Sequence, residues 1–442
     1  MKSVEFHGAS GNDYTLDARL AQGGQGTIYK VTSRSDGKAY AVKWYHARLA
    51  SQEQRKQLEM LAQRGAPRVE VDGIQFIWPL EMVTLPDNSS FGYVMPLYDS
   101  DRYVHLNRVI NGKRKQPRND VLCRLSYLIG IALEAVHHAG LAYCDINLGN
   151  IQFDFDAGQL IVCDNDNVVV NNAEAGVMGV PEFMAPEVAL GKDKPNAQSD
   201  LYSLAILLYQ LWIWEHPMEG RLTAQVRCWD QPAKRKFYAD EPIFVHHPTD
   251  QRNSAVGDAM LAYSVKRWEM LCPAALKKAF LQTFTEGIHQ SNKRTRLADW
   301  RHLFMEMEAN AVRCTSCSAV NLVDVDAPKR NCFHCGALLN FRQLISVQFP
   351  GGHSKLVVHA DALLRRHHLD MGSGLAHAND IVGKVENHPK QAGAHILRNL
   401  TDEPWFYDQD DKKYRVEPGQ ARPLVPGGSI TLGTAKLKIE AL

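Results

Sequence analysis

The chain has 442 residues, of which 45% are hydrophobic and 22% charged, and its formal net charge is +1. This length favours several domains over a single core, and the balanced charge offers no general electrostatic footprint for nucleic acid or an anionic membrane. The N-terminus has no apolar stretch typical of a secretory signal, and the longest apolar run, Leu201 to Trp214, is too short and too polar to span a bilayer. We therefore expect a cytoplasmic protein that binds neither nucleic acid nor a membrane.

A glycine-rich turn is the first motif along the chain. Short strands flank it and a third strand follows, which predicts a β-meander. Gly23, Gly24 and Gly26 leave room in the turn for the backbone to approach phosphate oxygens. Lys43 lies on the third strand, where a fixed cation can bridge the α- and β-phosphates of ATP. The turn alone is typical of an ordinary hairpin, whereas the turn with Lys43 indicates a nucleotide site.

A helix is expected next, over residues 50–64, because the composition favours helix and a glycine and a proline follow it. Glu59 in this helix is the predicted carboxylate partner of Lys43. Glu53 is a competitor, and the alternative is that Glu59 is only a solvated surface charge. Residues 91–97 then have the pattern of a buried strand that leads into a connector.

A polar loop after a predicted helix at residues 121–138 carries three groups suited to phosphoryl transfer. Asp145 can orient an acceptor hydroxyl, and Asn150 and Asp164 offer the oxygen ligands that Mg²⁺ prefers. Asp164 follows Asn150 by fourteen positions, which leaves room for a β-hairpin turned at residues 156–158. The alternative is a polar loop in which Asp and Asn serve only turn chemistry.

Together, in this order and at this spacing, the motifs resemble those of the eukaryotic-like (Hanks-type) Ser/Thr protein kinases of bacteria over residues 1 to about 305. The resemblance implies an α+β bilobal kinase fold and transfer of the γ-phosphoryl group of ATP with Mg²⁺ or Mn²⁺. It implies that Asp145, Lys43 and Glu59 are catalytic and that Asn150 and Asp164 bind the metal. The residues that it assigns to the nucleotide are Gly23, Gly24, Gly26, Ile28, Ala41, Lys43, Met95, Leu97, Asn150 and Asp164.

The same resemblance assigns supporting roles. Leu97 is expected to donate its backbone N–H to adenine, because the preceding residue is a proline and has no N–H. Asp200, before an apolar helix, is expected to hold the backbone of the catalytic loop. Glu187 is expected to pair with a distant arginine, for which Arg294 is the best match and Arg296 the alternative.

Activation is one point where the chain departs from the kinase pattern. Cys144 stands where an arginine would gather a phosphorylated activation segment, and no Ser, Thr or Tyr lies between Asp164 and Glu187. Both the acceptor hydroxyl and its cationic partner are missing, so we do not expect activation by phosphorylation of this segment.

Other departures concern the catalytic groups themselves. Asn165 and Asp166 replace the Phe and Gly that usually follow the metal-binding aspartate. Asn147 replaces a lysine that would neutralise the transferring phosphoryl group, and Val180 replaces a threonine that would bond to the catalytic aspartate. The replacements at Asn147, Asn165 and Asp166 predict slow chemistry or compensation by other residues, and Val180 leaves the acceptor specificity open.

Two cysteine pairs of the C-X-X-C type follow the kinase-like region. Fourteen residues separate the pairs, and this spacing is typical of a zinc ribbon in which four thiolates close a tetrahedral site. Because a closed site has no open coordination position, we expect the Zn²⁺ to be structural. The predicted ligands are Cys314, Cys317, Cys332 and Cys335.

From Phe341 onward, short alternating segments separated by turn residues predict an all-β domain. It resembles a forkhead-associated sandwich, a family that reads phosphothreonine with an arginine and a serine. Lys384 and Ala392 stand at these positions, whereas His395 is retained. We therefore expect a docking domain in which phosphopeptide recognition is weakened or lost.

The predicted organisation has three parts. They are a kinase domain at residues 1–305 (N-lobe 1–95, C-lobe 98–305), a zinc ribbon at 306–342 and an all-β sandwich at 343–442. This order resembles the kinase of bacterial three-component systems associated with tellurite resistance. The resemblance implies a protein substrate, such as a von Willebrand A-type protein, and a protein phosphatase 2C-type phosphatase as antagonist.

The leading functional prediction is an ATP- and Mg²⁺-dependent kinase that phosphorylates Ser or Thr of a partner protein in bacterial signalling or stress response. The second is a pseudokinase scaffold that assembles partners without transferring phosphate, as Asn147, Asn165, Asp166 and Val180 suggest. A third is a small-molecule kinase, which the Ala-Pro-Glu motif ending at Glu187 disfavours.

Overall fold

The computed structural model describes the chain apart from residues 1–3, 87–89, 172–178, 371–376 and 378. It forms two compact units. The first comprises residues 1–116, 128–264 and 280–297, and the second comprises residues 117–127, 265–279 and 298–442. Because these compact units cut through several helices, they do not coincide with the predicted domain boundaries, which stay predictions.

A closed six-stranded barrel begins the first unit, with the strand order β1-β2-β3-β4-β7-β6. The predicted meander and the predicted strand before the connector are confirmed as β2 to β4 and β7, whereas β1 and β6, which complete the barrel, were not predicted. The bounds are β1 Glu5–Gly8, β2 Asp13–Gln22, β3 Gly26–Ser33, β4 Ala39–Tyr45, β6 Glu81–Thr84 and β7 Gly92–Pro96.

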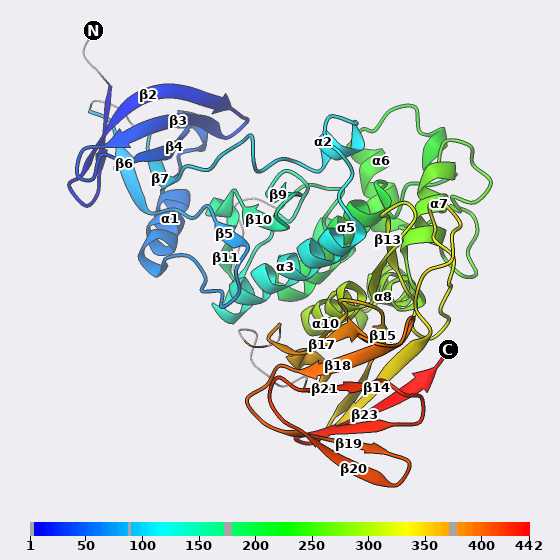
Figure 1. Cartoon of the computed structure of the whole chain (residues 1–442). Coiled ribbons are helices and arrows are strands. Elements are labelled where there is room, and N and C mark those ends of the chain that lie inside the picture. The colour runs from blue at the N-terminus through cyan, green and yellow to red at the C-terminus, as the bar shows by residue number, and fades with distance from the viewer. Residues whose placement is uncertain (1–3, 87–89, 172–178, 371–376, 378) are drawn as a thin grey trace. The chain divides into compact units, whose positions relative to one another are not determined.

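Helix α1, Gln52–Arg64, lies beside the barrel (Figure 1). The side chain of Ser51 caps it by accepting a hydrogen bond from the backbone N–H of Gln54, which would otherwise have no partner within the helix. Leu58 is fully buried and belongs to the same apolar cluster as Tyr45 and Met95 of the barrel. The helix is therefore held by both a cap and an apolar face.

Two long helices follow in the chain, α5 within the first unit and α3 with residues in both units. In α5, Ala197–Ile213, Asn196 accepts hydrogen bonds from two backbone N–H groups, and nearly every side chain is buried. The hairpin predicted after Asn150 is confirmed as β9 and β10. The other elements are β5 Ile74–Phe76, α2 Asn107–Ile110, α3 Asn119–His138, β8 Leu141–Ala142, β9 Ile151–Asp154, β10 Gln159–Val162, β11 Val169–Val170, α4 Pro186–Ala189, α6 Gln231–Arg235, a π-helix Lys236–Asp240 and α9 Glu286–His289.

Among the described residues, α3 alone has the length and composition that could cross a membrane. Of its most apolar window, 72% is buried inside the protein. A buried core helix meets the same two criteria, so the composition of α3 is explained by its packing.

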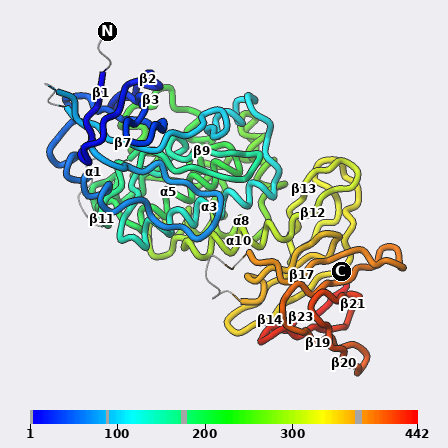
Figure 2. The backbone as a smooth tube through the Cα atoms, turned by 60° about the vertical axis from the view of Figure 1, so that its left-hand side comes forward, coloured from blue at the N-terminus to red at the C-terminus, as the bar shows by residue number. Residues whose placement is uncertain are grey.

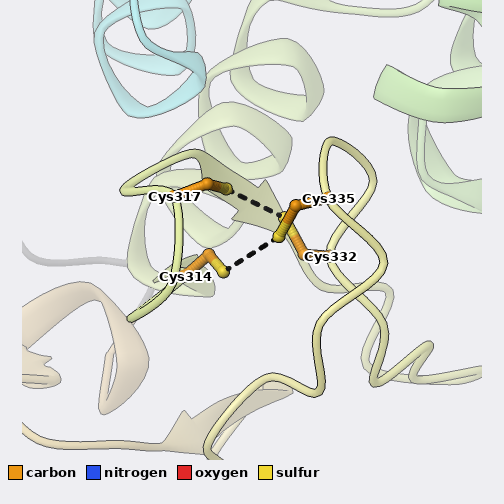
Figure 3. A group of neighbouring side chains, drawn as sticks. All are labelled: Cys314, Cys317, Cys332 and Cys335. Carbon is orange, nitrogen blue, oxygen red and sulfur yellow. Dashed lines mark hydrogen bonds between the residues drawn. The ribbon is translucent and has the colours of Figure 1, made fainter.

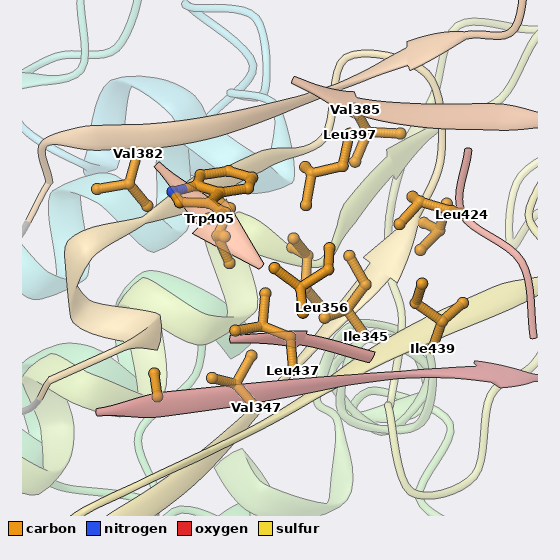
Figure 4. Close-up of a cluster of buried hydrophobic side chains, with 14 of the residues drawn as sticks. Ile345, Val347, Leu356, Val382, Val385, Leu397, Trp405, Leu424, Leu437 and Ile439 are labelled. Carbon is orange, nitrogen blue, oxygen red and sulfur yellow. The ribbon is translucent and has the colours of Figure 1, made fainter. Parts of the chain in front are cut away.

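The second unit contains a sandwich of two antiparallel sheets, ordered β15-β14-β23-β22-β19-β20 and β16-β17-β18-β21. Figure 2 shows β14, β19, β20 and β23 lying together, and Figure 4 shows the apolar side chains between the sheets, with Trp405 and Leu397 among them. The bounds are β14 Gln343–Phe349, β15 Gly352–Val358, β16 Leu363–Arg365, β17 Ile381–Asn387, β18 His395–Asn399, β19 Trp405–Gln409, β20 Lys412–Val416, β21 Ala421–Pro423, β22 Ser429–Leu432 and β23 Ala435–Ala441. An all-β C-terminal region is thereby confirmed.

The segment with the four cysteines shares its core with this sandwich. Phe341 and Val312 pack in one buried cluster with Leu344 of β14 and Val357 of β15. The amide of Asn310 also binds β15, because its Oδ1 accepts from the N–H of Val357 at 2.7 Å. The cysteine segment is therefore not an isolated module. The remaining elements lie wholly or partly in this unit; they are α7 Ala262–Leu271, α8 Ala274–Phe284, α10 Leu297–Ala309, β12 Ala311–Arg313 and β13 Val320–Leu322.

Candidate active site and cysteine cluster

Lys43 of β4 points into a buried set of polar groups. Its Nζ lies 2.7 Å from Oδ2 of Asp166 and 3.6 Å from Oδ1 of Asp164, and it donates to Oε1 of Gln25 at 2.9 Å. Burial alone would lower the pKa of Lys43, but the two carboxylates raise it above its usual value. The lysine is therefore held charged and aimed by acceptors from the chain itself.

Asp166, which the sequence analysis did not assign to the site, is the close partner of this lysine. It is fully buried and also accepts a hydrogen bond from the hydroxyl of Tyr45. Its backbone oxygen accepts from the amides of Gln54 and Gln57 on α1, at 3.4 and 3.1 Å. One residue thus connects β4, α1 and the segment that carries Asp164.

The predicted pairing of Lys43 with Glu59 is wrong in this structure. Glu59 forms an ion pair with Arg55 one helical turn earlier, with 3.1 Å between Arg55 Nε and Glu59 Oε1, and its side chain is 44% exposed. The physical reason is that the buried carboxylate of Asp166 already occupies the position next to Nζ. The alternative that Glu59 is a surface charge describes the structure better.

Asp145 lies at the centre of a ring of side-chain amides. Asn147 donates to its Oδ1 at 2.9 Å, while Asn150 and Asn167 donate to its Oδ2 at 3.0 and 3.3 Å. Burial raises the pKa of Asp145 above its usual value, and these three amides oppose that effect. The carboxylate is oriented by neutral donors, one of which is Asn147 in place of the usual lysine.

Asp164 and Asn150 supply oxygen atoms suited to a hard cation. Asp164 adopts a left-handed backbone conformation, with φ of +48°, which Asp tolerates better than most residues. Its side chain is 45% exposed, so its carboxylate is accessible. The amide nitrogen of Asn150 donates to Asp145, which leaves its oxygen for another partner. Carboxylate and amide oxygens are ligands that Mg²⁺ accepts, so the residues fit this metal.

Asn165 fixes the segment between these groups. It is fully buried, and its Nδ2 donates to the backbone oxygens of Ile77 and Val162 at 2.9 and 2.8 Å. Hydrogen bonds to the backbone thus replace the apolar packing of the usual phenylalanine. Residues 172–178, further along this segment, lie outside the described residues.

Two supporting roles that the kinase resemblance implied are present. The carboxylate of Asp200 accepts from the backbone N–H groups of Tyr143 and Cys144 at 2.8 and 3.0 Å. Arg294 donates from both terminal nitrogens to Glu187, at 2.8 Å each. The prediction of Arg294 is confirmed over its alternative Arg296, and a planar two-bond pair of this kind is among the stronger ionic contacts.

Four of the residues predicted to face the nucleotide lie together, whereas the three glycines of the turn differ from one another. Ala41 and Met95 are buried in one apolar cluster against which Ile28 and Leu97 also pack. A Cβ on Gly26 would lie only 2.2 Å from the backbone oxygen of Trp44, so this glycine is required by the pairing of β3 with β4. The turn positions Gly23 and Gly24 lie in open space, with no atom closer than 4.0 Å to a Cβ built there. Of the three glycines of the turn, Gly23 and Gly24 are therefore the two that leave room for a ligand.

The four predicted zinc ligands converge at a separate place, in the second unit (Figure 3). Their sulfur atoms all lie within 4.8 Å of one another, with Cys314 to Cys335 at 3.7 Å and Cys317 to Cys332 at 3.6 Å. Burial favours the thiol of Cys332, but the backbone N–H groups of Cys335 and His334 outweigh it and lower its pKa to about 6. Four sulfurs in this arrangement are compatible with a zinc site.

Asn321 of β13 supports this cluster. Its Nδ2 lies 3.6 Å from the sulfur of Cys332, and its Oδ1 accepts from the N–H of Phe333 at 2.9 Å. A buried amide therefore holds the second pair of cysteines in place, and a search for C-X-X-C spacing could not have revealed it.

The residues predicted to match the forkhead-associated pattern occupy different surroundings. Lys384 of β17 lies 3.3 Å from the carboxylate of Asp361, whereas His395 at the start of β18 is buried. Ala392 lies in the exposed loop between these strands. The loop therefore offers no hydroxyl at the serine position, and the cation at the arginine position is paired with a carboxylate of the chain itself. Weakened or lost phosphopeptide binding stays an expectation.

Comparison with known proteins identifies the family of the first unit. The protein kinase domain model matches residues 14–298, which is more than half of the chain. A probable serine/threonine-protein kinase of Streptomyces coelicolor is 28% identical over 227 residues, covering 48% of this chain and 31% of the relative. The serine/threonine-protein kinase PknA of Mycobacterium tuberculosis is 27% identical over 227 residues, covering 50% of this chain and 51% of the relative.

A fungal relative matches a shorter stretch. Protein kinase C of Aspergillus fumigatus is 30% identical over 125 residues, which is 27% of this chain and 10% of the relative. The chain thus spans at most about half the length of these relatives. The matched region contains Lys43, Asp145, Asn150 and Asp164. The chain belongs to the protein kinase family, and its relatives are Ser/Thr protein kinases.

Proposed function

We propose that this chain is an active Ser/Thr protein kinase that transfers the γ-phosphoryl group of ATP to a partner protein in bacterial signalling or stress response. One observation carries the proposal. Lys43, Asp145 and Asp164 are present together, and each is positioned by hydrogen bonds or ion pairs from neighbouring residues. A binding scaffold would have no chemical need for this arrangement.

In this proposal Lys43 holds the α- and β-phosphates and Asp145 accepts the proton of the acceptor hydroxyl. Asp164 and Asn150 would hold Mg²⁺, which when bound neutralises the charge of the phosphates. Ala41, Met95, Ile28 and Leu97 would enclose the adenine, since they form one apolar cluster. Glu59 has no direct role, because Asp166 orients Lys43.

The pseudokinase alternative rests on the missing lysine at Asn147 and the altered metal-binding motif. At both positions, the residue that is present makes a contact with a group of the proposed active site. Asn147 still bonds to the catalytic carboxylate at 2.9 Å, and Asp166 pairs with Lys43 at 2.7 Å. These contacts favour slow transfer over none, because the groups that bind phosphate, metal and acceptor are all retained.

The second unit is proposed to bind partners while a structural Zn²⁺ holds the cysteine segment. The candidate partners stay those of the three-component systems, namely a von Willebrand A-type protein as substrate and a protein phosphatase 2C-type phosphatase as antagonist. A cytoplasmic location and a role connected with tellurite resistance belong to the same proposal.

Phosphate transfer from γ-labelled ATP, with Mg²⁺ or Mn²⁺, tests the proposal. The purified full chain would be compared with Lys43→Ala and Asp164→Ala, with and without the candidate partner, and nucleotide binding would be measured in parallel. We expect label on protein Ser or Thr in the wild type and its loss in both variants. A folded, zinc-loaded wild type that binds nucleotide but labels nothing would favour the scaffold.

A further inference from the structure

A groove beside the catalytic loop has not been assigned a role so far. It has a volume of about 390 Å³ and is lined by residues of α2 and its flanks, among them His105, Arg108 and Lys113, and by Leu148 and Gly149. All of these residues belong to the first unit. Since Asn150 is the next residue in the chain, one wall of the groove is the catalytic loop itself.

The charge of this groove is positive. No Asp or Glu occurs between Tyr103 and Gln116, whereas this stretch contains four cations, namely Arg108, Lys113, Arg114 and Lys115. The nearby carboxylate of Asp156 lies 3.8 Å from Arg114. Within the part of the chain that the structure describes, no carboxylate pairs with Arg108 or Lys113.

The fold keeps these cations at the groove. Arg114 turns back over α2, since its backbone N–H donates to the oxygen of Arg108 at 2.9 Å. Val109 of α2 is buried, which fixes the helix to the unit and leaves Arg108 exposed. The two unpaired cations are thus displayed by an ordered segment.

The groove is also within reach of the chemistry. Gly149 bonds through its N–H to Asn147, which in turn bonds to the carboxylate of Asp145. Gly149 follows Asp145 by four positions, and an extended chain advances at most about 3.6 Å per residue, so their Cα atoms lie within about 14 Å. An extended peptide with its hydroxyl at Asp145 can enter the groove within about four or five residues.

We propose that this groove binds an acidic segment of the protein substrate, with Asp or Glu side chains a few residues from the phosphorylated Ser or Thr. The proposal rests on the proposed kinase function and names its substrate class. Two cations without internal partners attract anions, and the same field repels a lysine- or arginine-rich peptide. For the same reason, the positive charge of the groove disfavours a polycationic small molecule as the phosphate acceptor.

Peptide binding to the full chain tests the proposal without requiring catalysis. Three fluorescent serine peptides would be compared by anisotropy at low and at 0.5 M salt, with glutamate, alanine or lysine around one serine. The variants are Arg108→Glu/Lys113→Glu and its neutral form Arg108→Gln/Lys113→Gln. Lys38→Glu/Lys56→Glu is the matched control, since it reverses two exposed charges elsewhere in the same unit.

We expect the glutamate peptide to bind at least about tenfold more tightly than the others, with the advantage lost at high salt. The charge reversal should weaken its binding by about tenfold or more, the neutral form by less, and the control by no more than about twofold. Equal binding of the three peptides, no measurable binding, or no effect of the charge reversal would overturn the proposal. So would an oligonucleotide that binds more tightly than the glutamate peptide and competes with it.

Transfer to the same three peptides separates this proposal from the kinase function on which it rests. If phosphate is transferred to all three peptides without preference for the acidic one, the groove proposal is wrong and the kinase function stands. If the acidic peptide binds selectively but phosphate is transferred to no protein or peptide, the groove proposal stands and the proposed kinase function is wrong.

Discussion

The nucleotide cleft of the first unit and the cysteine cluster of the second satisfy their polar groups in opposite ways. In the cleft, the charge of Lys43 is balanced by Asp166 and Asp164 from the chain itself. In the cluster, the sulfurs contact other sulfurs, the side-chain amide of Asn321 and backbone N–H groups. The cleft can therefore be ordered before its ligand arrives, whereas the four thiolates need a cation to lie so close together.

This difference indicates what each site tolerates. A cleft that is paired internally can take the partner of its lysine from a different element, as Asp166 in place of Glu59 illustrates. A four-sulfur cluster would have no substitute for a bound ion, although the apolar core that it shares with β14 and β15 would limit the loss of stability when the ion is removed.

The largest expected effect is at the catalytic carboxylate. Asp145→Asn keeps the size of the side chain but removes the acceptor of the hydroxyl proton, so we expect transfer to fall by about 10²–10⁴-fold. Nucleotide affinity should change by less than about threefold. The assay is γ-phosphoryl transfer to protein, and full activity of this variant would contradict the role of Asp145.

Removal of the zinc ligands should destabilise the cysteine cluster and leave the nucleotide cleft unchanged. For Cys317→Ser/Cys332→Ser we expect loss of bound zinc and a loss of about 3–5 kcal/mol in the stability of the second unit. This is less than the ~10–16 kcal/mol of zinc binding by isolated fingers, because the shared core remains. Calorimetry should show one transition lowered by about 10 °C.

Nucleotide binding is the control for this prediction. It should be retained in the serine variant, because the contacts of Lys43 lie entirely within the first unit. Zinc content and melting that are unchanged in the variant would contradict the assignment of the cluster.

The amide ring around Asp145 predicts a smaller effect, on the pH dependence of transfer. Burial raises the pKa of Asp145, and the rate should fall as pH drops through that raised value, because the protonated group cannot accept a proton. Asn167→Ala removes one donor that favours the carboxylate. We expect the acid limb of kcat/KM to move to higher pH by up to about one unit.

Asn12→Ala, in the turn between β1 and β2, is the control and should leave the acid limb in place. A shift to lower pH in Asn167→Ala would contradict the sign of this argument. A control that shifts as much as the variant would show that the effect is not local to Asp145.

The smallest effect is expected at the surface of α1. Among the residues that the structure describes, Glu59 pairs with Arg55 alone, and its side chain is 44% exposed. Glu59→Gln should therefore change transfer and ATP affinity by less than about threefold. Steady-state kinetics with varied ATP checks this. A loss of about tenfold or more would show that Glu59 reaches Lys43 during the reaction.

Sequence analysis could predict the site residues that belong to a short motif of fixed spacing and residue type. Lys43 follows a glycine turn, Asn150 follows Asp145 by five positions, and each cysteine pair has the spacing of one knuckle. The pairing of Glu187 with Arg294, across 107 residues, was predicted from the kinase resemblance, since no local pattern reports which arginine is buried.

Other contacts depend on tertiary structure that no local pattern reports. Asp166 reaches Lys43 across 123 residues and through the left-handed turn at Asp164. In the same way, the sequence could not reveal that the cysteine segment shares its core with Leu344 and Val357, nor that β1 and β6 close the barrel. Several residues of the sequence could make each of these contacts, and only the three-dimensional structure shows which of them is buried at the right place.

The most direct test of the internally paired cleft is the kcat/KM for ATP of Asp166→Asn, measured beside Glu59→Gln. We predict that Asp166→Asn loses about 10–100-fold, since a buried Lys43 would lose its charged partner, while Glu59→Gln stays within about threefold of the wild type. Thermal melting of both variants would confirm that they are folded. The reverse order, with Glu59→Gln impaired and Asp166→Asn near the wild type, would contradict the assignment of Asp166 as the anchor of Lys43.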